Sequence, residues 1–314
     1  MRSLITGVAG FIGSHLAERL LAEGHQVVGV DNFLDNYPVR FKKENLKNLL
    51  RHPQFQWVNE DIVRLSFGEM LNDISHVFHL AAQPGVRSSW GRDFYHYTQN
   101  NIQATQVILE ACKGSSIKKF VYASSSSVYG DTDDLPMRET GNARPVSPYG
   151  VSKLAAEHLC YLYWKAYAVP TVSLRFFTVY GPRQRPDMFF HIFMKGLRRN
   201  EETPLYDDGA QTRDFTYCSD IIEGLLRAAL YPGTGEVFNL GGGAETSLLN
   251  AIRIIEKLSG KKSKLRRFER QRGDVRHTSA NLDLAAQKLD YHPKISLEEG
   301  LFREWEWIEK LEIG

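Results

Sequence analysis

Three glycines, Gly7, Gly10 and Gly13, constrain the fold of this chain more than any other feature. They follow a short β-like run, residues 2–6, and precede a helical pattern that begins at Ser14. Glycines at such a junction permit a tight turn and let the backbone approach a pyrophosphate, which binds at the positive N-terminal end of the helix. The spacing predicts a strand-turn-helix unit that binds a dinucleotide; a turn without a ligand is the alternative.

A second predicted strand, residues 26–30, ends at Asp31. An acidic residue about 20 positions beyond the glycines is placed to bind the ribose of an adenosine. A carboxylate at this position repels a 2′-phosphate, so we expect NAD as the cofactor in preference to NADP.

Further β-like runs alternate with helical stretches, and they cover residues 55–59, 76–80, 119–123 and 171–176. From Thr178 onward the alternation loosens and the loops lengthen. We therefore expect a first domain of residues 1–177 and a smaller second domain of residues 178–314 that lines a cleft. A strand near residues 236–241 is expected to return to the first sheet.

Candidate cofactor contacts follow the predicted strands. Asp61 and Ile62 come after the third strand and are placed to flank an adenine, although a turn aspartate is an alternative. Small residues follow the fourth strand, which suits a cofactor that passes close to the backbone. Asn100 and Asn101 lie in a long helical run, residues 95–112, and their role, structural or cofactor-positioning, stays open.

Tyr149 and Lys153 form a candidate acid/base pair. They are four residues apart at the start of a helical stretch that Ser147, as N-cap, and Pro148, as first helical residue, mark clearly. Residues at this spacing share a helix face, and a fixed cation beside a tyrosine stabilises the phenolate and lowers its pKa. A tyrosine and a lysine on an ordinary helix are the alternative interpretation.

Hydroxyl and guanidinium groups gather where a substrate is expected. Four consecutive serines, residues 124–127, follow the fifth predicted strand and can aim hydrogen-bond donors at a substrate oxygen. Two later loops, residues 180–188 and 205–215, carry arginines, which suit a diphosphate or a carboxylate because the guanidinium binds such groups in bidentate fashion.

Charge and composition exclude several classes of protein. The formal net charge of the 314 residues is +2 and the basic residues are dispersed, which argues against nucleic-acid binding. No stretch approaches the roughly 20 apolar residues of a membrane span, and no signal peptide is recognisable at the N-terminus. The three cysteines lack metal-ligand spacing, so we expect no metal, and reduced thiols in a cytoplasmic protein.

Together these motifs resemble the extended short-chain dehydrogenase/reductases, and within them the nucleotide-sugar epimerases. The resemblance covers residues 1 to about 290 and rests on the glycine triplet, Asp31, His79-Leu-Ala-Ala82, Ser125 with Val128-Tyr129-Gly130, Tyr149-x-x-x-Lys153 and Gln211-Thr-Arg213-Asp214-Phe215. Residues 84–90 and 175–188 are most similar to bacterial UDP-glucuronate 4-epimerases. The fold implied is a Rossmann-type doubly wound parallel sheet with a smaller C-terminal substrate-binding α/β domain.

The resemblance implies a tightly bound NAD, a UDP-sugar substrate and C4 epimerisation through a 4-keto intermediate. Tyr149, Lys153 and Ser125 would be the catalytic residues. The implied cofactor contacts are Gly7, Gly10, Phe11, Ile12, Gly13, Asp31, Asn32, Asp61, Ile62, Leu80, Ala81, Ala82, Gln83, Asn100, Ala123, Tyr149, Lys153, Phe176 and Val179. The implied substrate contacts are Arg87, Ser125, Ser126, Ser127, Thr178, Arg185, Met188, Leu205, Tyr206, Arg213 and Asp274.

The chain departs from its apparent relatives at several positions. Many relatives have asparagine in place of Thr178 and glycine in place of Asp207. Related dehydratases and decarboxylases have a glutamate in place of Ser127, which disfavours both of those activities here. An arginine expected near Asp274 falls on Gln271, so either Arg270 or Arg272 is left to contact a phosphate.

Several functional alternatives remain. A 4-epimerase for UDP-glucose or UDP-N-acetylglucosamine, a UDP-glucuronate decarboxylase and a non-catalytic NAD-sensing protein are all compatible with this fold. The resemblance also implies a homodimer, because members of the family pair through helices that match residues 95–112 and 149–167.

Overall fold

A seven-stranded parallel sheet forms the centre of the computed structural model, which describes residues 1–311. Its order is β10-β6-β5-β4-β1-β2-β3, and every strand pairs in parallel with its neighbours. The strands are β1 (Arg2–Thr6), β2 (Gln26–Asp31), β3 (Phe55–Asn59), β4 (His76–His79), β5 (Lys119–Ser125), β6 (Thr171–Phe176) and β10 (Glu236–Leu240). The predicted doubly wound sheet is confirmed.

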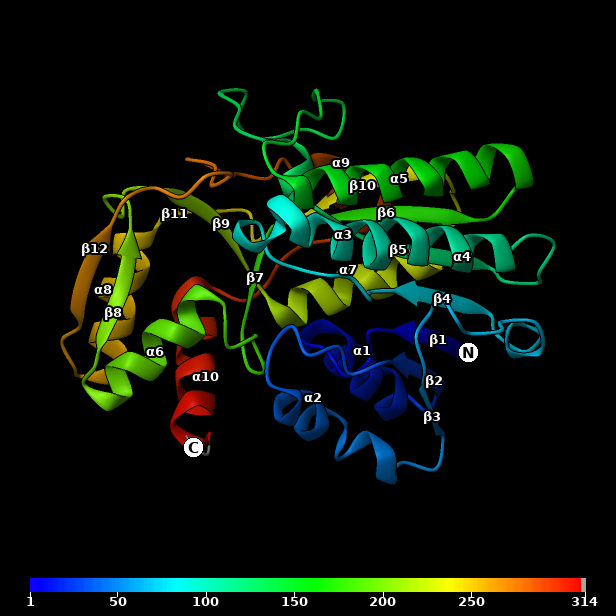
Figure 1. Cartoon of the computed structure of the whole chain (residues 1–314), viewed down its shortest axis with the longest axis horizontal. Helices are drawn as coiled ribbons and strands as arrows, with labels where there is room; N and C mark the ends of the chain where they lie inside the picture. Colours follow the sequence, from blue (N-terminus) through cyan, green and yellow to red (C-terminus); the bar gives the residue numbers. More distant parts are fainter. Residues whose placement is uncertain (312–314) are drawn as a thin grey trace.

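Helices cover both faces of this sheet (Figure 1). One face carries α1 (Phe11–Ala22) and α7 (Cys218–Leu230); the other carries α3 (Phe94–Tyr97), α4 (Ala104–Ala111) and α5 (Pro148–Tyr167). The strand order reverses between β1 and β4, and ligands of open α/β sheets bind at the carboxyl ends of the strands on either side of such a reversal.

The long helical run predicted over residues 95–112 is interrupted. A π-helical turn, Thr98–Gln103, separates α3 from α4. Such turns widen the helix by one residue and often occur at functional sites. The interruption lies beside the helix that carries Tyr149 and Lys153, since the π-helical turn packs against α5.

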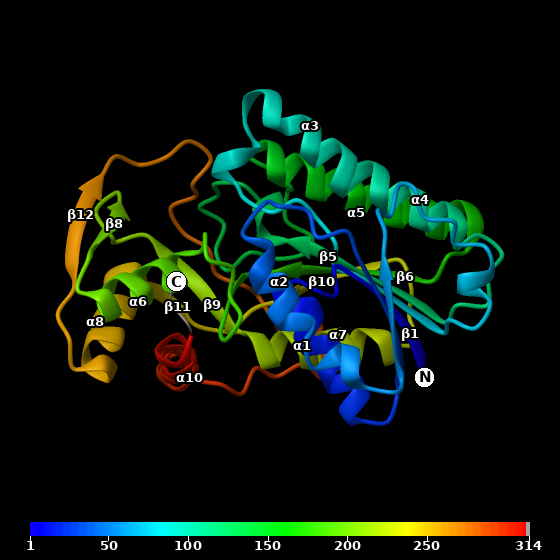
Figure 2. The same ribbon diagram turned by 60° about the horizontal axis from the view of Figure 1, so that its bottom comes forward.

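The second lobe is built on two small sheets (Figure 2). A three-stranded sheet holds β7 (Thr178–Tyr180), β9 (Thr212–Tyr217) and β11 (Glu245–Ser247), and a two-stranded sheet holds β8 (Glu202–Tyr206) and β12 (Lys264–Phe268). The helices that follow β7 and have not yet been named are α6 (Phe189–Arg199), α8 (Leu248–Ser259), α9 (Asp283–Leu289) and α10 (Leu297–Lys310). Helix α2 (Val39–Leu46) belongs to the first part of the chain and packs against α1. β8 and β12 lie at the end of the molecule away from the N-terminus.

One hydrophobic core joins the two lobes. Leu16 of α1, Phe193 of α6 and Ile308 of α10 are fully buried members of the same cluster. Burial of apolar surface contributes about 25 cal/mol per Å², so this shared core holds the lobes against each other. The loops between them are thereby placed at the carboxyl edge of the large sheet.

Candidate active site

The glycine turn leaves no room for side chains. Gly7 has φ of +73°, and a Cβ on this residue would lie 2.8 Å from the backbone nitrogen of Ala81. A Cβ on Gly13 would lie 2.2 Å from the carbonyl oxygen of Gly7. The turn therefore brings bare backbone to the N-terminus of α1, where a pyrophosphate group is stabilised.

Asp31 is fixed by the backbone beside this turn. Its carboxylate accepts hydrogen bonds from the backbone nitrogens of Ala9 at 3.2 Å and of Phe33 at 2.9 Å. Burial raises the pKa of Asp31, whereas the charge of Lys42 and these backbone donors act in the opposite direction. The carboxylate is thus held in one orientation at the edge of the cavity described next.

A long cavity runs from Asp31 and Asp61 to Tyr149 and Phe176. The predicted cofactor residues that line it are Gly7, Gly10, Phe11, Ile12, Gly13, Asp31, Asn32, Asp61, Ile62, Leu80, Ala81, Ala82, Asn100, Ala123, Tyr149, Lys153 and Phe176. Gln83 and Val179 are not among the residues that line it, and Val179 is buried in the core. The cavity has the walls of a dinucleotide site, and we call it the cofactor cavity.

Sequence reasoning missed part of the cofactor cavity. Asn36, Tyr37, Lys42 and Pro84 also line it. The Lys42 side chain is only 5% exposed and its ammonium donates a hydrogen bond to the carbonyl oxygen of Leu34 at 2.6 Å. The Oδ1 atom of Asn36 is buried and has no hydrogen-bond partner within residues 1–311, which leaves it available to a ligand. Asn36, Tyr37 and Lys42 lie in a polar connection whose pattern carries no signal for a site, whereas Pro84 follows β4, beside the predicted contacts Ala81 and Ala82.

Helix α5 begins as predicted. The Ser147 hydroxyl accepts a hydrogen bond from the backbone nitrogen of Gly150 at 3.1 Å, and Pro148 is the first residue of α5. Tyr149 and Lys153 both line the cofactor cavity. The ammonium of Lys153 lies 4.7 Å from the ring centroid of Tyr122 and is almost fully buried.

Burial shapes the acid/base properties of this pair. The pKa of Tyr149 is raised, because burial raises it more than the contact with Ser125 and the charge of Arg185 lower it. Burial lowers the pKa of Lys153 to about 7. The charge of Lys153 therefore responds to nearby groups around neutral pH.

The two asparagines of the π-helical turn have different positions. Asn100 lines the cofactor cavity. The Asn101 amide donates to the Ser152 hydroxyl at 2.8 Å and accepts from the backbone nitrogen of Gln83 at 2.7 Å. Asn101 thus connects α5 to the loop after β4, while Asn100 faces the cofactor cavity.

A second cavity lies beside the first, and we call it the substrate cavity. Its walls include the predicted substrate residues Ser126, Ser127, Thr178, Arg213 and Asp274, together with Val86, Val146, Ser147, Gly273, Val275 and Thr278. The serine run joins the two cavities, because Ser124 lines the first whereas Ser126 and Ser127 line the second. A ligand in the substrate cavity would therefore lie next to Ser125.

Arg87 and Tyr206 lie at the edge of the substrate cavity. The guanidinium of Arg87 forms an ion pair with Asp274, with 2.7 Å between Nη2 and Oδ2, and lies 3.9 Å from the ring centroid of Tyr206. Arg213 donates to the carbonyl oxygens of Thr212, Val275 and Arg276, so this arginine is held by backbone.

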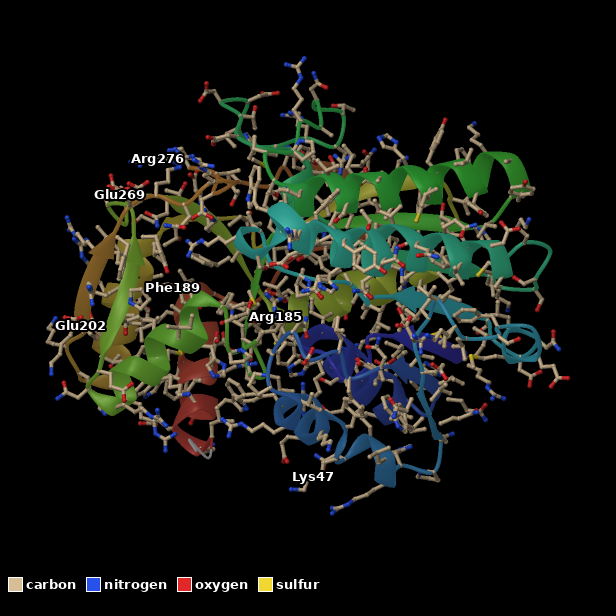
Figure 3. All side chains as sticks on the ribbon, viewed as in Figure 1. Lys47, Arg185, Phe189, Glu202, Glu269 and Arg276 are labelled. Carbon is tan, nitrogen blue, oxygen red and sulfur yellow. The ribbon has the colours of Figure 1, made fainter. Side chains whose placement is uncertain are left out.

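Three predicted substrate residues lie elsewhere. Arg185, whose place near the middle of the molecule is labelled in Figure 3, lines the cofactor cavity. Its guanidinium forms a bidentate ion pair with Asp187 at 3.0 Å. Met188 is the N-cap of α6, and Leu205 is fully buried in the core. A contact of Leu205 with a ligand would require backbone atoms or movement, and it stays a prediction.

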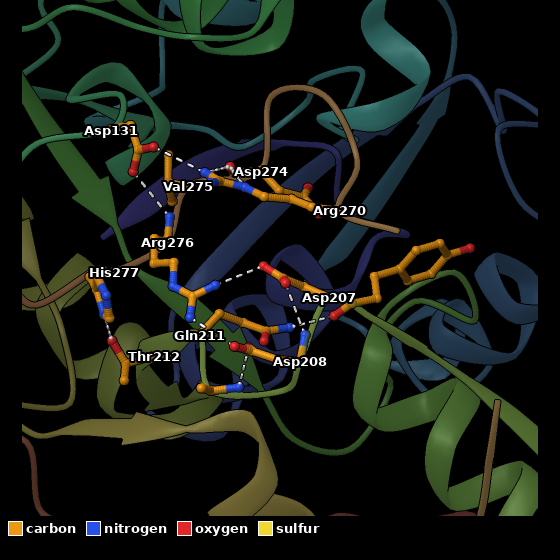
Figure 4. A network of polar contacts seen from close by, with 12 residues as sticks. Asp131, Asp207, Asp208, Gln211, Thr212, Arg270, Asp274, Val275, Arg276 and His277 are labelled. Carbon is orange, nitrogen blue, oxygen red and sulfur yellow. Dashed lines mark hydrogen bonds and ion pairs between the residues drawn. The ribbon is translucent and has the colours of Figure 1, made fainter. Parts of the chain in front are cut away.

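A network of charges orders the loops around the substrate cavity (Figure 4). Arg276 pairs with Asp207 at 3.0 Å and with Asp208 at 2.9 Å. Arg270 pairs with Asp131 and donates to the carbonyl oxygen of Asp274, so it supports the loop that carries Asp274. Asp207 has φ of +65°, a backbone conformation that glycine adopts more readily than other residues.

Within residues 1–311 no group of three or more histidine, cysteine, aspartate or glutamate side chains is arranged to hold a metal ion. No helix in the same range is long and apolar enough to cross a membrane.

The sheet, the glycine turn and the Tyr149–Lys153 helix together define an extended short-chain dehydrogenase/reductase. More narrowly, the chain belongs to the GDP-mannose 4,6 dehydratase family, whose model matches residues 4–303. The predicted resemblance is confirmed.

Individual relatives span the whole chain. An uncharacterized UDP-glucose epimerase of Bacillus subtilis is 44% identical over 100% of both chains. A UDP-glucuronate 4-epimerase of Thermodesulfobacterium geofontis is 40% identical, with 97% of this chain and 95% of the relative covered. The crystal structure of a UDP-glucuronic acid 4-epimerase from Bacillus cereus, in complex with UDP-glucuronic acid and NAD, is 44% identical, with 99% of each chain covered and a TM-score of 0.96.

Proposed function

We propose that this protein is an NAD-dependent UDP-sugar 4-epimerase that interconverts UDP-glucuronate and UDP-galacturonate. The observation that carries the proposal is the position of Tyr149 and Lys153 on the wall of the cofactor cavity, next to a hydroxyl-lined second cavity. The two cavities share the serine run at the end of β5. A cofactor in one and a sugar in the other would meet at Ser125 and Tyr149.

The residues of the cofactor cavity fit NAD. Bare backbone at the glycine turn accommodates the pyrophosphate, and Asp31 offers a carboxylate to the adenosine ribose. The unpartnered Oδ1 atom of Asn36 is a further acceptor on the same wall. When bound, NAD supplies a hydride acceptor and donor for C4 of the sugar.

The residues of α5 and β5 would move the proton. Tyr149, as phenolate, takes the proton of the sugar 4-hydroxyl and returns it to the 4-oxygen after the sugar has turned over. Lys153 stabilises the phenolate through its charge. The Ser125 hydroxyl acts to lower the pKa of Tyr149 and can donate to the same sugar oxygen.

The substrate cavity supports a uronic acid as the sugar. Ser126, Ser127 and Thr178 present hydroxyl donors, and charge-assisted bonds from such donors fix a carboxylate. The UDP group would lie against Arg213 and Asp274, with the uracil near Leu205 and Tyr206. No carboxylate stands at position 127 to act at C5, which disfavours dehydration despite the family's name.

A neutral UDP-sugar is the second candidate, because the relative from Bacillus subtilis is called a UDP-glucose epimerase. Purified protein should be assayed with UDP-glucuronate, UDP-glucose and UDP-N-acetylglucosamine, and products identified by NMR. We expect UDP-galacturonate from the first and at least tenfold lower rates with the others. Turnover of a neutral sugar alone would overturn the uronic acid assignment, and released carbon dioxide would identify a decarboxylase.

A homodimer is part of this proposal. Tyr95 of α3 and Tyr161, Leu162 and Tyr167 of α5 are 50% or more exposed, which is unusual for large apolar side chains on neighbouring helices. A second copy that packs on α5 would cover them, as the resemblance implies. Light scattering at micromolar concentration tests this, and a monomer would contradict it.

We also propose the cytoplasm as the location and residues 1–177 and 178–314 as the two domains. Cys112, Cys160 and Cys218 are free and buried, which is compatible with a reducing compartment. The pairing of β10 with β6 supports a second domain that is interleaved with the first.

A further inference from the structure

We propose that Glu157 is a positioning residue of the acid/base site: its buried carboxylate keeps the Lys153 ammonium charged and holds the end of β5 against α5. The inference rests on the proposed roles of Tyr149 and Lys153. It concerns a side chain that contacts neither of the two cavities.

Glu157 and Arg175 form a buried ion pair beneath the site. The Glu157 carboxylate accepts from Nη2 of Arg175 at 2.5 Å and from Nε at 3.1 Å, and both side chains are only 6% exposed. The same carboxylate accepts a hydrogen bond from the Ser124 hydroxyl at 2.7 Å. Three elements, α5, β6 and β5, therefore meet at one carboxylate.

The ion pair is not needed to attach α5 to the sheet. Ala156, Cys160 and Tyr163 on the same helix already pack into a hydrophobic cluster with sheet residues. Desolvation of two charges often costs as much as their attraction returns, so a buried ion pair is weak evidence for stability. A role in the site accounts for its position better than a role in packing.

Glu157 is the anion nearest to Lys153 along the helix. The two residues are four apart on α5 and share a face, with about 5–6 Å expected between their Cβ atoms. Cys160 also faces Lys153, but burial raises the pKa of this thiol far above its usual range, so it is neutral at physiological pH. Glu157 is left as the charged partner.

Among the residues that the structure describes, the other groups around Lys153 do not supply a negative charge. The Tyr122 ring is neutral because burial raises its pKa. Burial lowers the pKa of His79 to about 3, and its ring nitrogens bond to the hydroxyls of Thr6 and Thr105. Tyr149 carries a negative charge only as the catalytic phenolate.

Glu157 also acts on the serine run. Because Ser124 donates to Glu157, its hydroxyl is turned toward α5 although the residue lines the cofactor cavity. Arg175, the partner of Glu157, also contacts the segment after the serine run, since its guanidinium lies 4.7 Å from the ring centroid of Tyr129. Ser125 stands between these two fixed points.

The test is the pH profile of kcat for two single variants of the holoenzyme. Glu157→Gln keeps the shape and removes the anion, so Lys153 loses its proton at lower pH and the alkaline limb should shift down by about one unit. Arg175→Met leaves the anion uncompensated, so the limb should shift up. Both variants should lower the melting temperature. If the ion pair had a purely structural role, the alkaline limbs of both variants would change in the same way.

Two further variants serve as controls. Glu157→Gln combined with Arg175→Gln avoids an unpaired buried charge, and its alkaline limb should still shift down because the anion is gone. Asp220→Asn removes a buried carboxylate of α7, which accepts from the backbone nitrogens of Lys294 and Ile295, far from Lys153 in the chain. It should lower the melting temperature and leave the pH profile unchanged.

A second measurement needs no activity. At pH 6, Lys153→Met should raise the melting temperature more in the Glu157→Gln background than in the wild type, because the buried ammonium then has no anionic partner. At pH 9.5, where Lys153 is neutral, the rise should be equal in both backgrounds. Equal gains at both pH values, or limbs that shift together in the two single variants, would overturn the inference. A wild type that epimerises no UDP-sugar would instead overturn the proposed function, and this cycle would still test Glu157.

Discussion

Arg87 and Asp274 form an ion pair across the edge of the substrate cavity, with 2.7 Å between Nη2 and Oδ2. Arg87 comes from the loop after β4, whereas Asp274 follows β12 in the second lobe. The pair thus joins the two lobes beside the Tyr206 ring. Arg87 is 44% exposed at its side chain, so the attraction itself is screened by solvent and contributes little to stability.

The first prediction concerns Asp274. Asp274→Asn removes a charged acceptor from the substrate cavity, and loss of one such hydrogen bond typically costs 10-fold or more in affinity. We expect the KM for the UDP-sugar to rise about tenfold, with the NAD content unchanged because Asp274 does not line the cofactor cavity. Asp283→Asn, an exposed aspartate, is the control. An unchanged KM would show that Asp274 does not contribute to substrate binding.

The second prediction concerns the cofactor. Asp31→Ala removes the carboxylate that the backbone of Ala9 and Phe33 holds at the cavity wall, so NAD(H) should bind more weakly. Fluorescence titration of the apoprotein measures this, with the exposed Asp73→Ala as control. The purified wild type should carry NAD(H), and preferential binding of NADP would contradict the role given to Asp31.

The third prediction concerns the base. Tyr149→Phe keeps the ring and removes the ionisable proton, and general acid/base groups contribute about 10²–10⁴-fold to rate. We expect kcat to fall by at least that range while NAD stays bound. Tyr167→Phe, an exposed tyrosine of the same helix, should retain full activity. Activity of Tyr149→Phe within a few-fold of wild type would exclude the role.

Local sequence was sufficient for the parts of the molecule that depend on neighbouring residues. The turn at Gly7, the cap at Ser147 and the strand ends all follow from short patterns. The position of Lys42 in the cofactor cavity depends on how α2 folds back on the glycine turn, which no local pattern encodes. The pairing of Glu157 with Arg175 and of Arg87 with Asp274 likewise requires the assembled sheet.

Interruption of a helix was also beyond local patterns. The run over residues 95–112 has helical character throughout, yet the π-helical turn separates Asn100 from Asn101 in role. The Asn101 amide is bonded to the loop after β4 and to Ser152, and both contacts are long-range. These hydrogen bonds of Asn101 occur together with the π-helical turn, which helix propensity does not predict.

The fourth prediction concerns pH and Lys153. Burial lowers the pKa of Lys153 from 10.5 to about 7, so between these values the unfolded chain holds a proton that the folded chain has lost. The free energy of unfolding therefore rises with pH across this window, and the cost of the buried charge is complete below it. The cost amounts to at most about 5 kcal/mol.

Lys153→Met removes that cost. The variant should unfold at higher urea concentration than the wild-type holoprotein at pH 6, and the difference should narrow toward pH 10. Lys43→Met, at an exposed lysine, should give no pH-dependent difference. A constant difference between wild type and Lys153→Met at all pH values would mean that Lys153 stays charged in the folded state.

The last prediction concerns the protection of the intermediate. Oxidation of UDP-glucuronate at C4 gives a β-keto acid, which loses carbon dioxide when the breaking C–C bond lies parallel to the carbonyl π system. Ionisation of the carboxylate does not prevent this loss, so the protein has to control geometry. Ser126, Ser127 and Thr178 line the substrate cavity together and can hold the carboxylate in another orientation. Arg185, by contrast, lies in the cofactor cavity and is paired with Asp187.

Ser127→Ala combined with Thr178→Ala should therefore slow epimerisation and divert part of the flux to a UDP-pentose. The two changes remove hydroxyl donors from β7 and from the end of the serine run, and neither touches the Tyr149–Lys153 pair. Ser116→Ala with Thr140→Ala, at two exposed hydroxyls outside both cavities, is the matched control. The products are measured by NMR of the reaction mixture with UDP-glucuronate. If the double variant epimerises UDP-glucuronate normally and forms no pentose, these hydroxyls do not hold the carboxylate, and the assignment of a uronic acid as substrate loses its main support.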